Sequence, residues 1–273
     1  MDISNTSFLI AFGLTLIAGL STGIGSAMAF FAKKTNTNFL SIALGFSAGV
    51  MLYISFVELY GLGEDNFVGE YGTKLGSTYN FLFFMAGMLL IAIIDRLVPS
   101  NENPHEVHHV EELSEENKEK TKSKKLMRTG LFTALVIGIH NFPEGVATFA
   151  AGLSDLSIAI PITIAIAIHN IPEGIAVSIP IYYATNSRKK AFWYSFTSGL
   201  AEPVGGLIGF LILRNYLNDV VLGATFSIIA GIMVFISLDE LLPTAKEYGK
   251  PHAAIYGLIA GIGVMAISLI LFK

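Results

Sequence analysis

Residues 140–145 read HNFPEG, and residues 169–174, 29 positions later, read HNIPEG. Each copy lies near the middle of a long apolar run, where a membrane-spanning helix rarely carries even one ionisable residue. Two copies of the same set of His, Asn, Pro and Glu, at matching depth, indicate a metal ion held inside a lipid bilayer. These two stretches therefore predict a helical membrane protein whose metal site lies between neighbouring helices.

The composition is that of a membrane protein. Of the 273 residues, 53% are hydrophobic and only 14% are charged, with a mean hydropathy of +0.63, whereas a soluble domain carries about 25% charged residues. Apolar runs of about 20 residues, enough to cross about 30 Å of hydrocarbon, alternate with short charged stretches. We expect the lipid bilayer as the surroundings and no nucleic-acid partner. The chain has no cysteine, which excludes thiolate ligands and disulfides.

The apolar runs predict an all-α polytopic protein, a single transmembrane domain over residues 1–273 with eight membrane-spanning helices. Lys and Arg concentrate in cytoplasmic loops of membrane proteins. With the N-terminus outside, all 17 of them except Lys74, Arg214 and Lys273 fall on the cytoplasmic side, so both termini are predicted to lie outside. The helices are expected at residues 8–31, 39–60, 80–98, 128–152, 157–184, 190–213, 220–243 and 252–272.

One long hydrophilic stretch, residues 99–127, separates the third and fourth predicted helices. Its mixed charges and scarcity of apolar residues predict a mobile cytoplasmic loop. The loop contains His105, His108 and His109 next to several glutamates. It is either a solvated linker or a weak patch that captures metal in the cytoplasm, and composition alone leaves both readings open.

An internal repeat connects the two ends of the chain. Residues 48–59 (AGVMLYISFVEL) return as residues 230–241 (AGIMVFISLDEL), with seven of twelve positions identical. Gly19 and Gly199 align at nearly the same offset, so helices 1–2 match helices 6–7. Because five helices separate the partners, the second copy runs in the opposite direction across the membrane. Inverted repeats of this kind are typical of transporters that bind their substrate near the bilayer midplane.

The ionisable residues of the two motifs can face one ion. Residues four apart on a helix share a face, which brings His140 beside Glu144, and His169 beside Glu173. Glu202, in the sixth helix, adds a third carboxylate at mid-membrane. Each of the three glutamates would cost about 2.5–3.5 kcal/mol on insertion scales if its charge were left uncompensated. Since no Lys or Arg lies in the central part of a predicted helix, a divalent cation is the natural counter-charge.

The donor set indicates which metals fit. Imidazole and oxygen donors together suit Zn²⁺, Fe²⁺, Mn²⁺ and Co²⁺, while imidazole disfavours Mg²⁺ and Ca²⁺. Asn141 and Asn170 lie beside the same helix faces. With them, the number of donor groups exceeds what one four-coordinate zinc ion needs. This pattern has two interpretations. Either two adjacent metal ions are bridged by glutamate, or one metal ion is passed between overlapping sets of ligands. The metal would be a transported substrate, and no cofactor is expected.

Acidic residues also stand at two predicted helix ends. Glu58 ends the second helix near the outer face, and Asp239 and Glu240 end the seventh near the inner face. Related by the inverted repeat, they could form the outer and inner openings of a metal pathway. The alternative is that these acids are merely solvated.

The paired motifs, Glu202 before Pro203, and the His-containing loop between helices 3 and 4 make the chain similar to the ZIP (ZRT/IRT-like) family of metal transporters over essentially its whole length. The resemblance implies metal uptake into the cytoplasm across the cell membrane. It also implies a 3+2+3 arrangement, in which helices 1–3 and 6–8 are inverted repeats around a helix 4–5 hairpin. Many family members carry another residue, often Asp, at the position of Asn170. The implied binuclear site uses His140, Glu144, His169 and Glu173 for one metal, and Asn141, Glu144, Asn170, Glu173 and Glu202 for the other.

We therefore predict a carrier of Zn²⁺, with Fe²⁺, Mn²⁺ and Co²⁺ as further substrates, and not an enzyme. An intramembrane metal-dependent hydrolase is the main alternative, although no His-Glu-x-x-His occurs. A metal-sensing membrane receptor is another, which the loop at 99–127 would suit. The small-residue face of Gly257 and Gly261 could pack within the chain or form a homodimer, and the sequence leaves this open.

Overall fold

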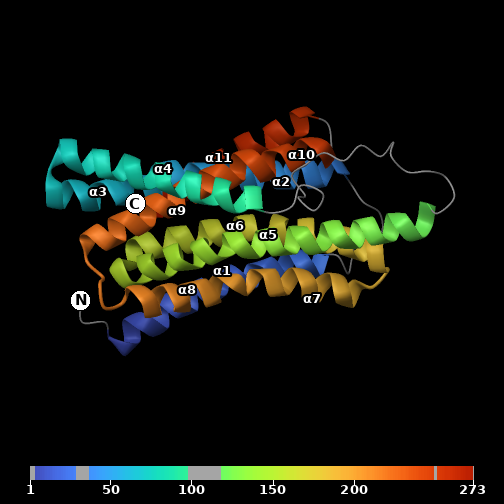
Figure 1. Cartoon of the computed structure of the whole chain (residues 1–273), viewed down its shortest axis with the longest axis horizontal. Helices are drawn as coiled ribbons and strands as arrows, with labels where there is room; N and C mark the ends of the chain where they lie inside the picture. The colour runs from blue at the N-terminus through green and yellow to red at the C-terminus, as the bar shows by residue number, and fades with distance from the viewer. Residues whose placement is uncertain (1–3, 29–36, 98–117, 249–250, 273) are drawn as a thin grey trace.

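The computed structural model describes residues 4–28, 37–97, 118–248 and 251–272 (Figure 1). Every regular element in these ranges is a helix, and none is a strand. The elements are α1 (Asn5–Met28), α2 (Thr37–Ile54), the π-helical turn η1 (Ser55–Leu59), α3 (Tyr60–Tyr71), α4 (Thr73–Leu97), α5 (Lys118–Ser154), α6 (Leu156–Thr185), α7 (Arg188–Gly199), α8 (Ala201–Leu213), α9 (Asp219–Ile236), the π-helical turn η5 (Ser237–Leu241), α10 (Leu242–Tyr248) and α11 (Pro251–Phe272).

The predicted all-α membrane protein is confirmed by the lengths and hydropathy of the helices. Among the described residues, seven helical stretches are long and apolar enough to cross a membrane. Helix α5 falls outside this set because its start is rich in Lys and its apolar part contains His140, Asn141 and Glu144, whereas isoleucines surround the same motif in α6. The seven are Asn5–Ala27, Asn38–Tyr71, Thr73–Arg96, Leu156–Ile179, Arg188–Leu213, Asp219–Glu247 and His252–Leu271.

Two predicted helix ends are wrong. The second helix continues through η1 and α3 to Tyr71, so Glu58 lies inside a helical rod and not at its end. The extension is stabilised by tertiary packing, since Phe67 is buried and stacks on Phe83 with ring centroids 5.4 Å apart. The rod ends at Gly72, whose φ of +74° favours glycine. The seventh helix likewise continues through η5 and α10, which places Asp239 and Glu240 inside a rod.

Two further boundaries differ from the prediction. Helix α5 begins at Lys118, so the segment 118–127 of the predicted mobile loop is helical. The rest of that loop up to residue 117, with His105, His108 and His109, lies outside the described residues. The predicted helix 190–213 is interrupted at Leu200, where α7 ends and α8 begins. Pro203 has no N–H to continue the helical hydrogen bonds, and Glu202 consequently stands in the first turn of α8.

The helices form two packed groups (Figure 1). In one group α1, α5, α6, α7 and α8 pack together, and in the other α2, α3, α4, α9, α10 and α11 do. The groups meet mainly where α6 lies on α2 and where α5 lies on α9. The two helices that carry the motifs therefore line the boundary between the groups.

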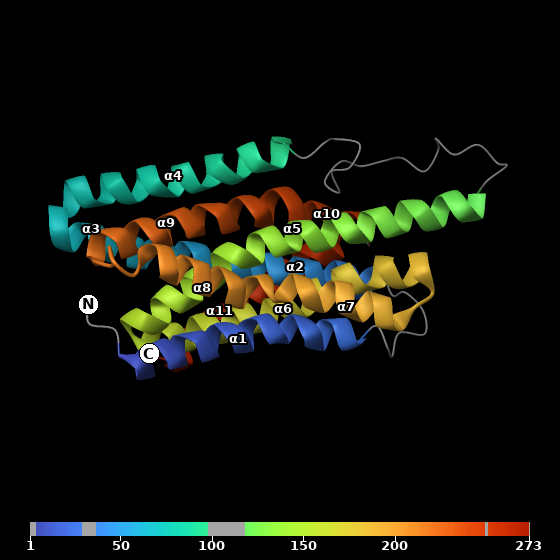
Figure 2. The ribbon, with the colours of Figure 1, turned by 60° about the horizontal axis from the view of Figure 1, so that its bottom comes forward.

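The packing pairs recur in the two halves of the chain. Helix α1 packs on α6 as α8 packs on α5, and α2 packs on α11 as α9 packs on α4. The turns η1 and η5 begin at Ser55 and Ser237, the offset of the sequence repeat. The first turn of α1 and the last turn of α11 lie at the same end of the bundle in both views (Figures 1 and 2).

The small-residue face of α11 is used within the chain. A Cβ atom added at Gly257 or Gly261 would collide with the backbone carbonyls of Ile42 and Phe46 on α2. The glycines thus allow α2 and α11 to approach closely. This face is covered by α2 and is not available for a homodimer.

Candidate metal site

The site is built on the hairpin of α5 and α6. The hairpin turns at Asp155, whose carboxylate accepts a hydrogen bond of 2.8 Å from the backbone N–H of Ser157 and caps the first turn of α6. That hydrogen bond holds the pKa of the exposed Asp155 carboxyl below its usual value. With so short a turn, α5 and α6 lie side by side along their length, and the two motifs come to the same level.

The four ionisable residues of the motifs meet in the interior and pair across the hairpin. The Nε2 atom of His140 lies 3.3 Å from Oε2 of Glu173, and Nε2 of His169 lies 3.3 Å from Oε2 of Glu144. The pair within α6, His169 Nε2 to Glu173 Oε1, is longer at 3.9 Å. All four side chains are buried. The structure therefore brings these four residues together, and each imidazole faces the carboxylate of the other helix.

The two asparagines and Glu202 extend this cluster towards α1, α7 and α8. The amide nitrogen of Asn170 donates to a carboxylate oxygen of Glu202 and, at 3.0 Å, to the carbonyl of Ala18 on α1. The amide nitrogen of Asn141 donates to the carbonyl of Ser198, at 3.3 Å. Because both asparagines use their N–H groups in this way, their amide oxygens remain available as ligands.

The glycines at the ends of the motifs allow neighbouring helices to approach. A Cβ atom on Gly145 would lie 2.6 Å from the carbonyl carbon of Glu202, and one on Gly174 would lie 2.9 Å from the backbone nitrogen of Ser26 on α1. Both distances are too short for ordinary contact. The close approach of α8 to α5 therefore brings the Glu202 side chain to the hairpin.

Buried polar atoms without a hydrogen-bond partner gather at this place. In the described parts of the chain there are nine such side-chain atoms, and seven belong to the predicted ligands. Leaving a buried donor or acceptor unpaired costs about 1–3 kcal/mol, so a native cluster of them indicates a place for a ligand. The seven atoms are His140 Nδ1 and Nε2, Asn141 Oδ1, Glu144 Oε1, Asn170 Oδ1, Glu173 Oε2 and Glu202 Oε2. Of these, His140 Nε2 and Glu173 Oε2 form the 3.3 Å ion pair described above without the geometry of a hydrogen bond.

The chemistry of this donor set fits a divalent transition metal as substrate. Imidazole nitrogens and carboxylate and amide oxygens are the ligands that such ions take. Within the described ranges, however, no three His, Asp or Glu side chains converge closely enough to hold a metal ion. The side chains are instead engaged in crossed pairs, which have to open for the donors to turn to one ion.

The acids predicted to line a pathway lie at different depths. Glu240 in η5 is 7% exposed and close enough to His140 for an electrostatic interaction. Asp239 is exposed and Glu58 in η1 is half-buried. The structure thus brings Glu240 towards the cluster.

Ser47 is a polar contact that the sequence did not reveal. Its hydroxyl, on α2, donates to Oε1 of Glu173 at 3.5 Å and to the carbonyl of His169 at 3.4 Å. Ser47 thus contributes a hydrogen-bonding side chain from the second helix group to the cluster. Ser47 lies just before the repeated segment, and its counterpart at the same offset is Ile229, so no pattern marks it.

A multi-pass helical membrane protein with a buried cluster of imidazole, carboxylate and amide groups between its helices has the features of a metal transporter. The family model described as ZIP zinc transporter matches residues 95–269. The chain therefore belongs to the ZIP zinc transporter family, whose members are transporters and not enzymes, and it is a multi-pass protein of the cell membrane. The family resemblance inferred from the motifs is confirmed.

Individual relatives match along nearly the whole chain. The zinc transporter ZupT of Clostridium perfringens is 60% identical over 97% of this chain and 96% of its own length. The zinc transporter ZupT of Streptococcus mutans is 62% identical, over 96% of this chain and 97% of its own length. That of Nitratidesulfovibrio vulgaris is 54% identical over 99% of both chains.

Proposed function

We propose that this protein transports zinc across the cell membrane into the cytoplasm, and that the ion is bound by the α5–α6 hairpin. The observation that carries the proposal is the cluster of seven buried polar atoms without a hydrogen bond, all on residues of the paired motifs or on Glu202. A cluster of buried carboxylates that faces histidines, and no Lys or Arg of the described residues, calls for further positive charge, which Zn²⁺ would supply. Fe²⁺, Mn²⁺ and Co²⁺ take the same kinds of donor and are proposed as further substrates.

Two adjacent metal positions account for the number of donors. His140, Glu144, His169 and Glu173 would hold the first ion after the crossed pairs open. Glu144 and Glu173 would bridge to a second ion. That second ion would also take the amide oxygens of Asn141 and Asn170 and a carboxylate oxygen of Glu202.

The transport machinery would consist of helices 1–3 and 6–8 as inverted repeats around the hairpin, in the 3+2+3 arrangement. The recurring packing pairs and the two matched π-helical turns support this reading. The Lys and Arg distribution supports termini on the outside. Substrate sites of such transporters lie where the repeats meet, and the boundary between the two helix groups suits that role.

Glu58 and the pair Asp239 and Glu240 would form the outer and inner parts of the ion path. Their positions inside the π-helical turns favour this role, because π-bulges are frequent at functional sites. The electrostatic interaction of Glu240 with His140 would help an ion leave the hairpin. Cytoplasmic capture by His105, His108 and His109 stays a prediction for residues outside the described ranges.

Uptake of radioactive zinc into proteoliposomes tests the function directly. Wild-type protein should accumulate zinc, and Glu144→Gln should lose most of the uptake because a bridging carboxylate is replaced by an amide of the same shape. Glu70→Gln makes the same chemical change at an exposed position of α3 and should transport normally. Wild-type-like uptake by Glu144→Gln would overturn the site, and zinc binding without accumulation by the wild type would overturn transport.

A further inference from the structure

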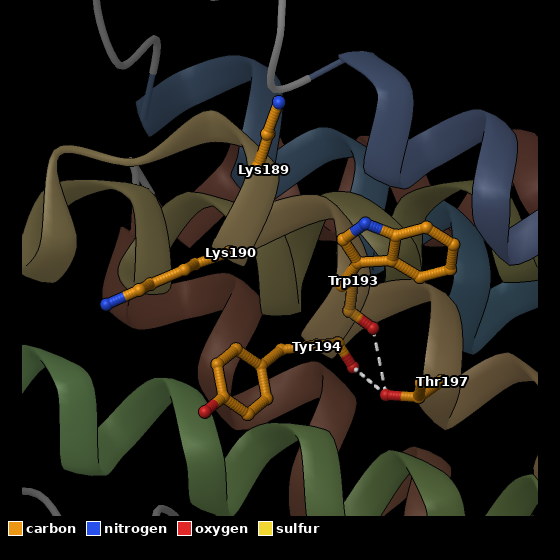
Figure 3. A pocket seen from close by; sticks show the side chains of 5 residues that line it. All are labelled: Lys189, Lys190, Trp193, Tyr194 and Thr197. Atoms are coloured by element: carbon orange, nitrogen blue, oxygen red, sulfur yellow. Dashed lines mark hydrogen bonds between the residues drawn. The ribbon is translucent and has the colours of Figure 1, made fainter.

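A second feature of the surface is a hollow at the start of α7, away from the metal cluster. It is lined by Lys189, Lys190, Trp193, Tyr194 and Thr197. Figure 3 shows the two lysine side chains extending outward from the first turn of α7, with the rings of Trp193 and Tyr194 one turn further on. The Thr197 hydroxyl donates to the backbone carbonyls of Trp193 and Tyr194 at 2.9 and 3.0 Å, so it is engaged within its own helix. The hollow is consequently apolar at its base and cationic at its rim.

A longer apolar groove continues from this hollow between α5 and α7. The groove shares Tyr194 and Thr197 with the hollow. Its remaining lining residues are small or aliphatic, apart from Ser198, whose backbone carbonyl accepts a hydrogen bond from Asn141. A Cβ atom added at Gly138 would meet nothing within 4 Å, so the groove is open at that point. The other lining residues are Leu131, Ala134, Leu135, Gly138, Ile139, Ser198 and Ala201.

The order of the groups along α7 matches the order of groups in a phospholipid. The lysines stand at the helix end, where lipid headgroups lie, and Trp and Tyr prefer the same membrane–water interface. The leucines and the isoleucine of the groove, which lie on α5, follow at the depth of the acyl chains. None of the acidic residues in the described ranges lines either the hollow or the groove, so no lining carboxylate would compete with a bound anion for the two lysines.

We propose that this hollow and groove bind one anionic phospholipid. Lys189 and Lys190 hold the phosphate, Trp193 and Tyr194 flank the glycerol region, and an acyl chain lies in the groove over Leu135 and Gly138. Basic pockets between membrane helices are suited to anionic headgroups. The acyl chain passes Ile139 and Ser198, which adjoin His140 and the Asn141–Ser198 hydrogen bond. The lipid therefore lies on the outer side of the wall that holds two proposed metal ligands.

Trp193 makes the site directly observable, because it is the single tryptophan of the chain and is 59% exposed. The full-length protein is reconstituted in vesicles that contain either phosphatidylglycerol or phosphatidylcholine with bromine atoms on the acyl chains, at equal mole fraction. Bromine quenches tryptophan fluorescence on contact. We expect at least twofold stronger quenching by the brominated phosphatidylglycerol.

Three variants separate a built site from general attraction of lipid to the surface. Lys189→Gln combined with Lys190→Gln should abolish the preference for phosphatidylglycerol, whereas Lys246→Gln, an exposed lysine on α10, should retain it. Gly138→Leu keeps both lysines, fills the groove and should also abolish the preference. Equal quenching by the two lipids in the wild type, or an unchanged preference in Gly138→Leu, would overturn the proposal. Since the measurement needs no metal, its failure would leave zinc transport untouched.

Discussion

Replacing Gly145 with alanine tests whether the close approach of α8 to α5 positions Glu202. The added Cβ atom would lie 2.6 Å from the carbonyl carbon of Glu202 and 2.8 Å from its Cα atom. Because the carbonyl oxygen of Glu202 would lie closer still, restoring ordinary contacts of 3.4 Å moves the two backbones apart by more than about 0.8 Å. All three obstacles are backbone atoms, so rotation of a flexible side chain cannot relieve the clash.

The expected result has two parts. Overpacking of this kind costs about 1–3 kcal/mol of stability. The shift also draws Glu202 away from Asn170, which weakens the second proposed metal position. Gly138→Ala is the matched control, since it makes the same change on α5 two turns earlier, where a Cβ atom meets nothing within 4 Å. Gly to Ala in a helix without a clash is expected to stabilise by about 0.5–1 kcal/mol.

The assay is thermal unfolding followed in detergent, together with zinc uptake in proteoliposomes. Gly145→Ala should unfold at a lower temperature than the wild type and take up zinc more slowly. Gly138→Ala should unfold at the same or a higher temperature and transport normally. If the two variants unfold and transport alike, the helix contact at Gly145 does not position Glu202, and the reasoning is refuted.

Three further changes test single contacts. Asn170→Asp removes the hydrogen bond to Glu202 and places two carboxylates side by side, so the unfolding temperature should fall without metal and recover with added zinc; a variant insensitive to zinc would contradict the second metal position. Ser47→Ala removes one hydrogen bond to Glu173, worth about 1 kcal/mol, and should weaken zinc binding by about fivefold in equilibrium binding while retaining transport. Asp155→Ala removes the cap of α6 and should lower the unfolding temperature at neutral pH. Because the folded-state pKa of Asp155 is lowered from 3.8, the difference from wild type should persist above that value and vanish as the pH falls through the lowered pKa, and a pH-independent difference would exclude the cap as its cause.

The helical rods and the buried polar cluster could be predicted because both leave strong local signals. Apolar runs long enough to cross the bilayer mark the rods, and the doubled motif marks the residues of the cluster. The end of the second helix could not be predicted in the same way. Polar and glycine residues after Gly61 favour a break, yet packing of Phe67 on Phe83 keeps the chain helical to Tyr71.

Local sequence patterns also could not predict which imidazole pairs with which carboxylate in the cluster. Spacing of four along one helix predicts that His169 faces Glu173, but the closer carboxylate is that of Glu144 on the neighbouring helix. Which of the two is nearer depends on the rotation and level of α5 against α6. Those are set by tertiary packing, including the contacts of Gly145 and Gly174 with α8 and α1.

The crossed pairing has a genetic consequence. The nearest carboxylate to His140 is that of Glu173, and the nearest to His169 is that of Glu144, so a substitution in either motif removes the nearest ionisable partner of a residue in the other. Effects of residues that share one network do not add. The duplicated motif therefore offers no redundancy: a lesion in one copy should be as severe as lesions in both, and neither copy can drift while the other preserves the activity.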